Sequence, residues 1–89
     1  MKPTEESLLT FPCDFPIKVF GLASSTFENN IITLIKEIIP TFSGAAVERR
    51  TSGGGKYHSL TLTVHVESRE QLDSIYRALT ASPLVLMAL

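Results

Sequence analysis

The sequence of 89 residues has one cysteine, almost no net charge and no long uninterrupted apolar run. Cys13 cannot form an internal disulfide or a paired-cysteine metal site, so packing must stabilise the fold. Eight basic and nine acidic side chains give a formal net charge of −1, which does not attract the whole molecule to nucleic acid or to an anionic membrane. The longest apolar stretch is interrupted by a threonine, a lysine and a glutamate, and a basic N-terminal region followed by an apolar segment is absent. We therefore expect a soluble, cytoplasmic protein without a membrane segment.

The sequence also lacks the residue patterns typical of catalysis. His58 and His65 are predicted to face opposite ways on one strand, and no acid stands at a spacing that would complete a catalytic triad or a metal site with them. The glycine-rich run before Lys56 is not a phosphate-binding P-loop, because Tyr57 follows the lysine where serine or threonine is needed. We therefore predict a protein that is not an enzyme, with no catalytic residues, metal or cofactor.

At this length we expect a single domain that spans residues 1–89. Residues 1–14 are predicted to be a polar N-terminal lead with a short apolar patch, because Pro3 and Pro12 argue against a long helix there.

Two helices are predicted by a serine that is followed three residues later by Glu or Gln, the pattern of a capping box. Ser25 precedes the first helix and Ser68 the second, and a proline ends each helical pattern. The predicted ranges are 26–39 and 69–80, and both show apolar residues at helical spacing.

Four strands are predicted around these helices, at residues 15–22, 45–52, 59–66 and 84–89. The third strand has the clearest alternation: its inward residues are Leu60, Leu62, Val64 and Val66, and its outward residues are Ser59, Thr61, Thr63 and His65. Three glycines at 53–55 suit a hairpin between the second and third strands, because such turns use positive φ angles.

The element order is strand, helix, strand, strand, helix, strand, which predicts an α+β fold of the ferredoxin-like βαββαβ type. In this fold a four-stranded antiparallel sheet carries two helices on one face, and the strand order 4-1-3-2 places the second and fourth strands at the edges. The fourth strand is apolar without alternation, so we expect it to be buried on both faces or to lie in an interface. Homodimer formation is the simplest such interface.

Several short segments resemble a known family. They are the run Ile17 to Gly21, the run Gly55 to Leu60 with its Gly-x-Tyr-His-Ser pattern, and Met87 to Leu89. Over nearly the whole chain the sequence resembles the YbeD-like family of small bacterial proteins of unknown function. The resemblance implies a ferredoxin-like fold similar to the small-molecule-binding ACT regulatory domains, and a regulatory role in the cytoplasm. In ACT-like domains the first strand-to-helix turn lines an effector site at a subunit interface, which points to Gly21, Leu22, Ser24 and Ser25.

The residues themselves indicate three candidate binding surfaces. The first is the polar face of the sheet, where we expect Phe20, Tyr57, Ser59 and Met87 to make contacts; its alternative is an ordinary solvated face, with His58 hydrogen-bonded under a helix end. The second is the basic group Arg49, Arg50 and Lys56 around the glycine hairpin, which suits a phosphate or a carboxylate, unless it is a solvated hairpin end. The third is the turn before the first helix, unless Ser25 already caps its free amides.

The function predicted from these features is that of a non-enzymatic, ACT-like regulatory or interaction domain. We expect it to act through the open sheet face on a protein partner or a small-molecule effector, and to form a homodimer. The alternative is an RNA-binding module, because RNA recognition motifs share the element order and Phe20 and Tyr57 could stack on bases. Ser59, Thr61 and Thr63 stand where further stacking rings are needed, so we expect no nucleic-acid partner.

Overall fold

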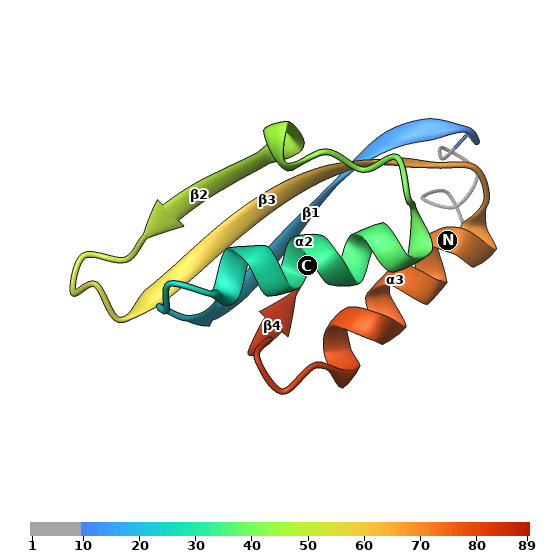
Figure 1. Cartoon of the computed structure of the whole chain (residues 1–89). Helices are drawn as coiled ribbons and strands as arrows, with labels where there is room; N and C mark the ends of the chain where they lie inside the picture. The colour runs from blue at the N-terminus through green and yellow to red at the C-terminus, as the bar shows by residue number, and fades with distance from the viewer. Residues whose placement is uncertain (1–9) are drawn as a thin grey trace, which may run out of the picture.

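The computed structural model describes residues 10–89 and shows a sheet with both helices on one face (Figure 1). The elements in chain order are β1 (Cys13–Leu22), α2 (Phe27–Ile38), a 3₁₀ turn η1 (Gly44–Ala46), β2 (Val47–Thr51), β3 (Tyr57–Val66), α3 (Arg69–Ala81) and β4 (Met87–Ala88). The sheet order is β2-β3-β1-β4, and all neighbouring strands are antiparallel. The ferredoxin-like fold and the strand order predicted from the sequence are confirmed.

The two central strands, β1 and β3, pair along their whole length, from Cys13 opposite Val66 to Leu22 opposite Tyr57. The inward side chains of β3 are fully buried, as the alternation predicts; they are Leu60, Leu62, Val64 and Val66. The helices complete the core with a buried stripe each, consisting of Phe27, Ile31 and Ile35 from α2 and Leu72, Ile75 and Leu79 from α3. Each of these large side chains contributes about 1.5–3 kcal/mol by leaving water.

The two serine patterns give opposite outcomes. Ser68 caps α3 as predicted: its Oγ accepts a hydrogen bond from the Gln71 amide at 3.2 Å, and the Gln71 side chain accepts one from the Glu67 amide at 2.7 Å. The predicted cap at Ser25 is wrong, because α2 begins one residue later, with Thr26 as its N-cap and no side-chain cap bond. Thr26 has φ −108° and ψ −5°, a helical conformation rather than the extended one that lets a cap side chain turn back toward the first amides.

The N-terminal lead is shorter than predicted. β1 begins at Cys13, two residues before the predicted start, and Phe11 and Cys13 pack against the core. Residues 1–9 of the predicted lead lie outside the described residues.

The hairpin predicted at the three glycines is confirmed between β2 and β3. Ser52 closes it, since its amide donates to the Tyr57 carbonyl at 2.9 Å and its carbonyl accepts from the Gly55 amide at 2.8 Å. Gly55 has φ 71°, so the turn uses the glycine conformation at that one position of the run.

β4 is shorter and more exposed than predicted. A turn after α3, in which the Val85 amide donates to the Ser82 carbonyl at 3.2 Å, takes up the first part of the predicted strand. Pairing with β1 then extends from the Leu86 amide, which donates to Phe20, to Leu89, which exchanges two bonds with Lys18. The prediction that this strand is buried on both faces is wrong within the chain, because four of its side chains are exposed: Leu84, Leu86, Met87 and Leu89.

Candidate functional site

The face of the sheet that the helices leave open carries a continuous row of side chains across all four strands. Arg50 of β2 lies opposite Ser59 of β3, Ser59 lies opposite Phe20 of β1, and Phe20 lies opposite Met87 of β4. Four predicted contact residues are therefore neighbours on one face. The sheet register brings them together, although they are far apart in the sequence.

An open hollow of about 390 Å³ lies at the hairpin end of this face, and we call it the Arg50 hollow. It is lined by Lys18, Phe20, Arg50, Thr51, Ser52, Tyr57, His58 and Ser59. A second hollow of about 320 Å³ adjoins it, shares Lys18, Arg50 and Ser59, and adds Glu48 and Thr61. Sequence reasoning missed Lys18, although its position two residues before Phe20 on an alternating strand places it on the same face.

The charges of the Arg50 hollow are uneven along the face. Within residues 10–89, neither Lys18 nor Arg50 has an ion-pair partner, so both cations are available to a ligand. Glu48 lies on the far side of Arg50 from the hairpin, in the adjoining hollow. Lys18 and Glu48 are both in register with Thr61, so Arg50 is the cation of this hollow that lies nearer the hairpin.

The predicted basic group is divided between two faces. Arg49 points toward the helices, because neighbouring residues on a strand face opposite ways, and its Nη1 lies 3.6 Å from the Glu28 carboxylate of α2. Such an exposed pair contributes about 0–1 kcal/mol. Lys56 lies in the exposed hairpin, where its carbonyl accepts a hydrogen bond from the Ala23 amide at 2.8 Å. Arg50 is thus the one arginine of this pair that faces the hollow.

The strand-to-helix turn is packed at Gly21 and open beyond it. A Cβ at Gly21 would lie 2.5 Å from the Leu84 carbonyl oxygen and 2.6 Å from Cζ of Phe27, so this position must be glycine for the turn to pack. Ser25 is exposed in the turn that precedes α2. Next to them is an apolar hollow of about 330 Å³, lined by Leu22, Ala23, Ser24, Phe27, Pro83, Leu84 and Leu86.

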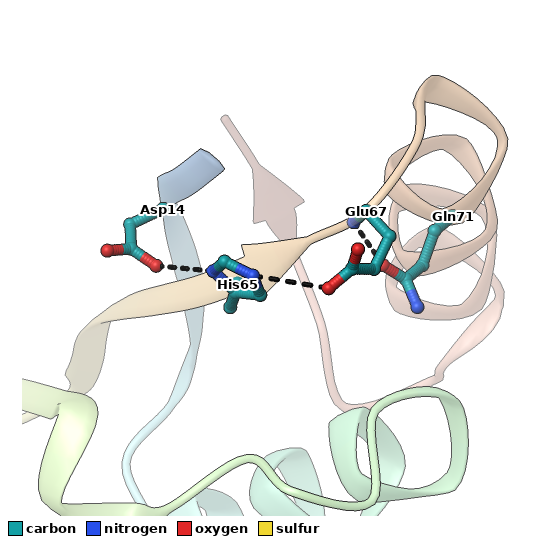
Figure 2. A network of polar contacts seen from close by, with 4 residues as sticks. All are labelled: Asp14, His65, Glu67 and Gln71. Atoms are coloured by element: carbon teal, nitrogen blue, oxygen red, sulfur yellow. Dashed lines mark hydrogen bonds and ion pairs between the residues drawn. The ribbon is translucent and has the colours of Figure 1, made fainter. Parts of the chain in front are cut away.

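A separate polar network lies at the opposite end of the sheet (Figure 2). Asp14 is the cross-strand partner of His65, and its Oδ1 lies 3.0 Å from the His65 Nδ1, while Glu67 lies 3.2 Å from the His65 Nε2. The hydrogen bond with Asp14 raises the pKa of His65 above its usual value, outweighing the opposing effect of desolvation, and the charges of Glu67 and Asp14 add to the rise. Sequence reasoning missed this contact, because it placed Asp14 in the N-terminal lead rather than on β1.

His58 points to the helix side of β3, with its ring centroid 6.4 Å from that of Phe27. Its Nδ1 is buried and has no hydrogen-bond partner in the described part of the chain. The alternative in which a hydrogen bond holds His58 under a helix end is therefore wrong.

Residues 10–89 show neither a metal site nor a helix able to span a membrane. Residues 10–89 contain no group of three or more His, Cys, Asp or Glu side chains placed to hold a metal ion. The helices in the same range are too short and too polar to cross a membrane.

The fold is similar to that of ACT domains. The solution structure of protein HP0495 from H. pylori superposes with a TM-score of 0.69 at 19% identity, covering 100% of this chain and 96% of the other. The ACT domain from the GTP pyrophosphokinase of Chlorobium tepidum superposes with a TM-score of 0.54 at 18% identity, covering 86% of this chain and 97% of the other. At these identities the likeness concerns the fold alone.

The sequence comparisons identify the family. Residues 6–89 match the family described as protein of unknown function (DUF493). A UPF0250 protein of Paraburkholderia phymatum is 48% identical over the full length of both chains, and one of Nitrosomonas europaea is 45% identical over 97% of this chain and 99% of its own. The chain belongs to this family of small bacterial proteins, in agreement with the predicted YbeD-like resemblance.

The network around His65 should make stability depend on pH. A raised pKa means that folded His65 holds its proton more tightly than the unfolded chain, whose pKa is near 6.5. The stabilisation is therefore fully present below that value and is lost as the pH rises through the raised folded pKa. We expect the urea midpoint of the wild type to exceed that of His65→Gln at about pH 5.5, and the difference to shrink by about pH 8.

Thr63→Gln, on the same face of β3, is the matched control. The difference in urea midpoint between this variant and the wild type should not vary over this pH range. If the difference in urea midpoint between the wild type and His65→Gln stays constant with pH, the stabilising contact of His65 with Asp14 and Glu67 is contradicted.

Proposed function

We propose that this chain is a regulatory or interaction domain that acts in the cytoplasm, without catalysis, by binding a protein partner through its open sheet face. The observation that supports this most strongly is the composition of that face. The helices cover the other side of the sheet, and the open side carries exposed Tyr57 and Met87 beside Lys18 and Arg50, two cations without an ion-pair partner within residues 10–89. Exposed aromatic and apolar side chains rimmed by charge are typical of binding surfaces.

The shape of the Arg50 hollow favours a protein partner over a small effector. Its lining comes from one sheet face and a hairpin, and within residues 10–89 no helix or strand lies on the opposite side to close over a ligand. Small-molecule sites usually enclose most of the ligand surface, which an open sheet cannot do alone. The similarity to an ACT domain supports a regulatory role, since ACT folds are typically regulatory.

We also propose that the domain forms a homodimer through β4. The two edges of the sheet differ in charge: β2 carries Glu48, Arg49 and Arg50, whereas residues 78–89, which include β4, contain no charged side chain. Charged edges discourage pairing with another chain, and apolar edges allow it. Leu86 is 59% exposed at the uncharged edge, so a second copy would cover apolar surface there.

The open face is tested by a paired comparison of variants. Arg50→Gln with Tyr57→Ala alters the Arg50 hollow, and Arg49→Gln with Thr33→Ala alters the helix side to a similar extent. We expect quantitative affinity capture from a lysate of the source bacterium to lose its specific proteins with the first pair and to keep them with the second. Equal capture by both pairs would contradict a role for the open face.

Two separate measurements, a thermal-shift titration and retention on RNA, would change the assignment. A thermal midpoint raised by a small carboxylate, with no protein captured, would favour an effector-binding domain. Retention on RNA that falls steeply with salt would favour the RNA-binding alternative.

The homodimer is tested by sedimentation equilibrium. We expect the wild type to be dimeric at micromolar concentration and Leu86→Lys to be monomeric, because the substitution places a charge on the apolar edge. Thr33→Lys adds the same charge on the exposed surface of α2 and should remain dimeric. A wild type that is monomeric at this concentration would exclude the proposed interface.

A further inference from the structure

We infer that the Arg50 hollow recognises an extended acidic segment of the partner protein, in which a carboxylate side chain is followed at alternate positions by apolar side chains. This inference rests on the proposed function and specifies the chemistry of the partner. It comes from the row of residues that crosses the sheet from Arg50 to Met87.

The charge at the start of this row selects an anion. Arg50 and Lys18 both line the hollow and have no ion-pair partner within residues 10–89. A guanidinium binds a carboxylate through two parallel hydrogen bonds, and the hydroxyl groups of Ser59 and Tyr57 add donors beside it. A cationic segment would meet the positive charges of both Arg50 and Lys18 on this face.

Glu48 fixes where on the face the carboxylate lies. This side chain shares the adjoining hollow with Arg50 and Lys18, and it repels an anion that approaches from that side. The favourable position is therefore the hairpin side of Arg50, next to Ser52 and Tyr57. From there the rest of the segment runs across the sheet over Phe20.

The spacing of the row matches an extended chain. Adjacent strands are about 4.8 Å apart, so Phe20 lies about 9.6 Å and Met87 about 14 Å from the Arg50 backbone. Side chains on one side of an extended segment repeat every ~6.7 Å, so the second and third reach about 6.7 and 13 Å from the first. When the Arg50 side chain brings the first position about 3 Å nearer, the second lies over Phe20 and the third lies about 2 Å past the Met87 backbone, a gap that a flexible methionine side chain spans. An acidic residue, followed by apolar residues two and four positions later, therefore fits Arg50, Phe20 and Met87.

The openness of the surface argues for a chain rather than a free molecule. Tyr57 is 42% exposed and Met87 is 51% exposed, so a ligand on the row keeps one side in water. A protein segment tolerates this, because the rest of its protein contributes further contacts around the row. A free acid of the same chemistry would gain only the contacts on one side.

The experiment is selection of random peptides displayed on phage against three forms of the full chain. They are the wild type, Arg50→Glu, and the control Arg49→Gln, which alters the neighbouring arginine on the opposite face. We expect the wild type and Arg49→Gln to enrich Asp or Glu two residues before an apolar residue, and Arg50→Glu to enrich Lys or Arg at that position. Circular dichroism should show that all three forms are folded.

The enriched peptide then gives a quantitative readout by fluorescence anisotropy. In Arg50→Gln, loss of a charge-assisted hydrogen bond should raise the dissociation constant by roughly tenfold or more. Arg49→Gln should leave it within about twofold of the wild type, because Arg49 does not face the row.

Four results would overturn the inference. One is enrichment of apolar peptides without acidic residues, with binding lost in Tyr57→Ala. It would keep the open face as a binding surface but exclude an acidic segment as its partner. Acidic enrichment that Arg50→Glu does not change would place the anion elsewhere. Displacement of the peptide by polyuridine at low salt would assign the row to RNA. If no peptide is enriched and the capture experiment shows no loss either, the proposed function fails together with the inference.

Discussion

The alternation of side chains along β3 is the constraint on which the rest of this molecule depends. Leu60, Leu62, Val64 and Val66 are fully buried beneath the two helices, so the residues between them must face the other way. Residues 10–89 contain two helices of 12 and 13 residues, and both lie on the same face. Within these residues no helix covers the opposite face, and the row from Arg50 to Met87 lies on that face.

Local patterns predicted the elements well, since helix stripes, strand alternation and glycine turns depend on neighbouring residues. They failed where the backbone conformation decides which residue caps a helix, and where a turn decides how long a strand is. Ser25 and Ser68 have the same capping pattern, yet Ser68 is the N-cap of α3 in an extended conformation, with φ −157° and ψ 163°, whereas the N-cap of α2 is Thr26 in a helical conformation. The apolar run at the C-terminal end did not reveal the turn at Ser82, which shortens β4 and exposes its leucines.

The candidate site was predicted in part, for a similar reason. Alternation places Phe20, Tyr57 and Ser59 on one face, and register then brings Arg50 and Met87 to the same row. The basic group around the hairpin was predicted from closeness in sequence, which does not separate Arg49 from Arg50. The contact between Asp14 and His65 joins residues 51 positions apart, and only the start of β1 at Cys13 makes it visible.

The sheet therefore has three different surfaces: a helix-covered face, an open charged and aromatic face, and an apolar edge at β4. Adjacent residues of β3 have opposite environments, and two single variants, Leu62→Lys and Thr63→Lys, test this most directly. In urea denaturation, Thr63→Lys should stay within about 0.5 kcal/mol of the wild type, because the new charge lies in water. Leu62→Lys should lose several kcal/mol or fail to unfold cooperatively, because it buries an unpaired ammonium group. Similar stability losses in the two variants would contradict the open face and the site built on it.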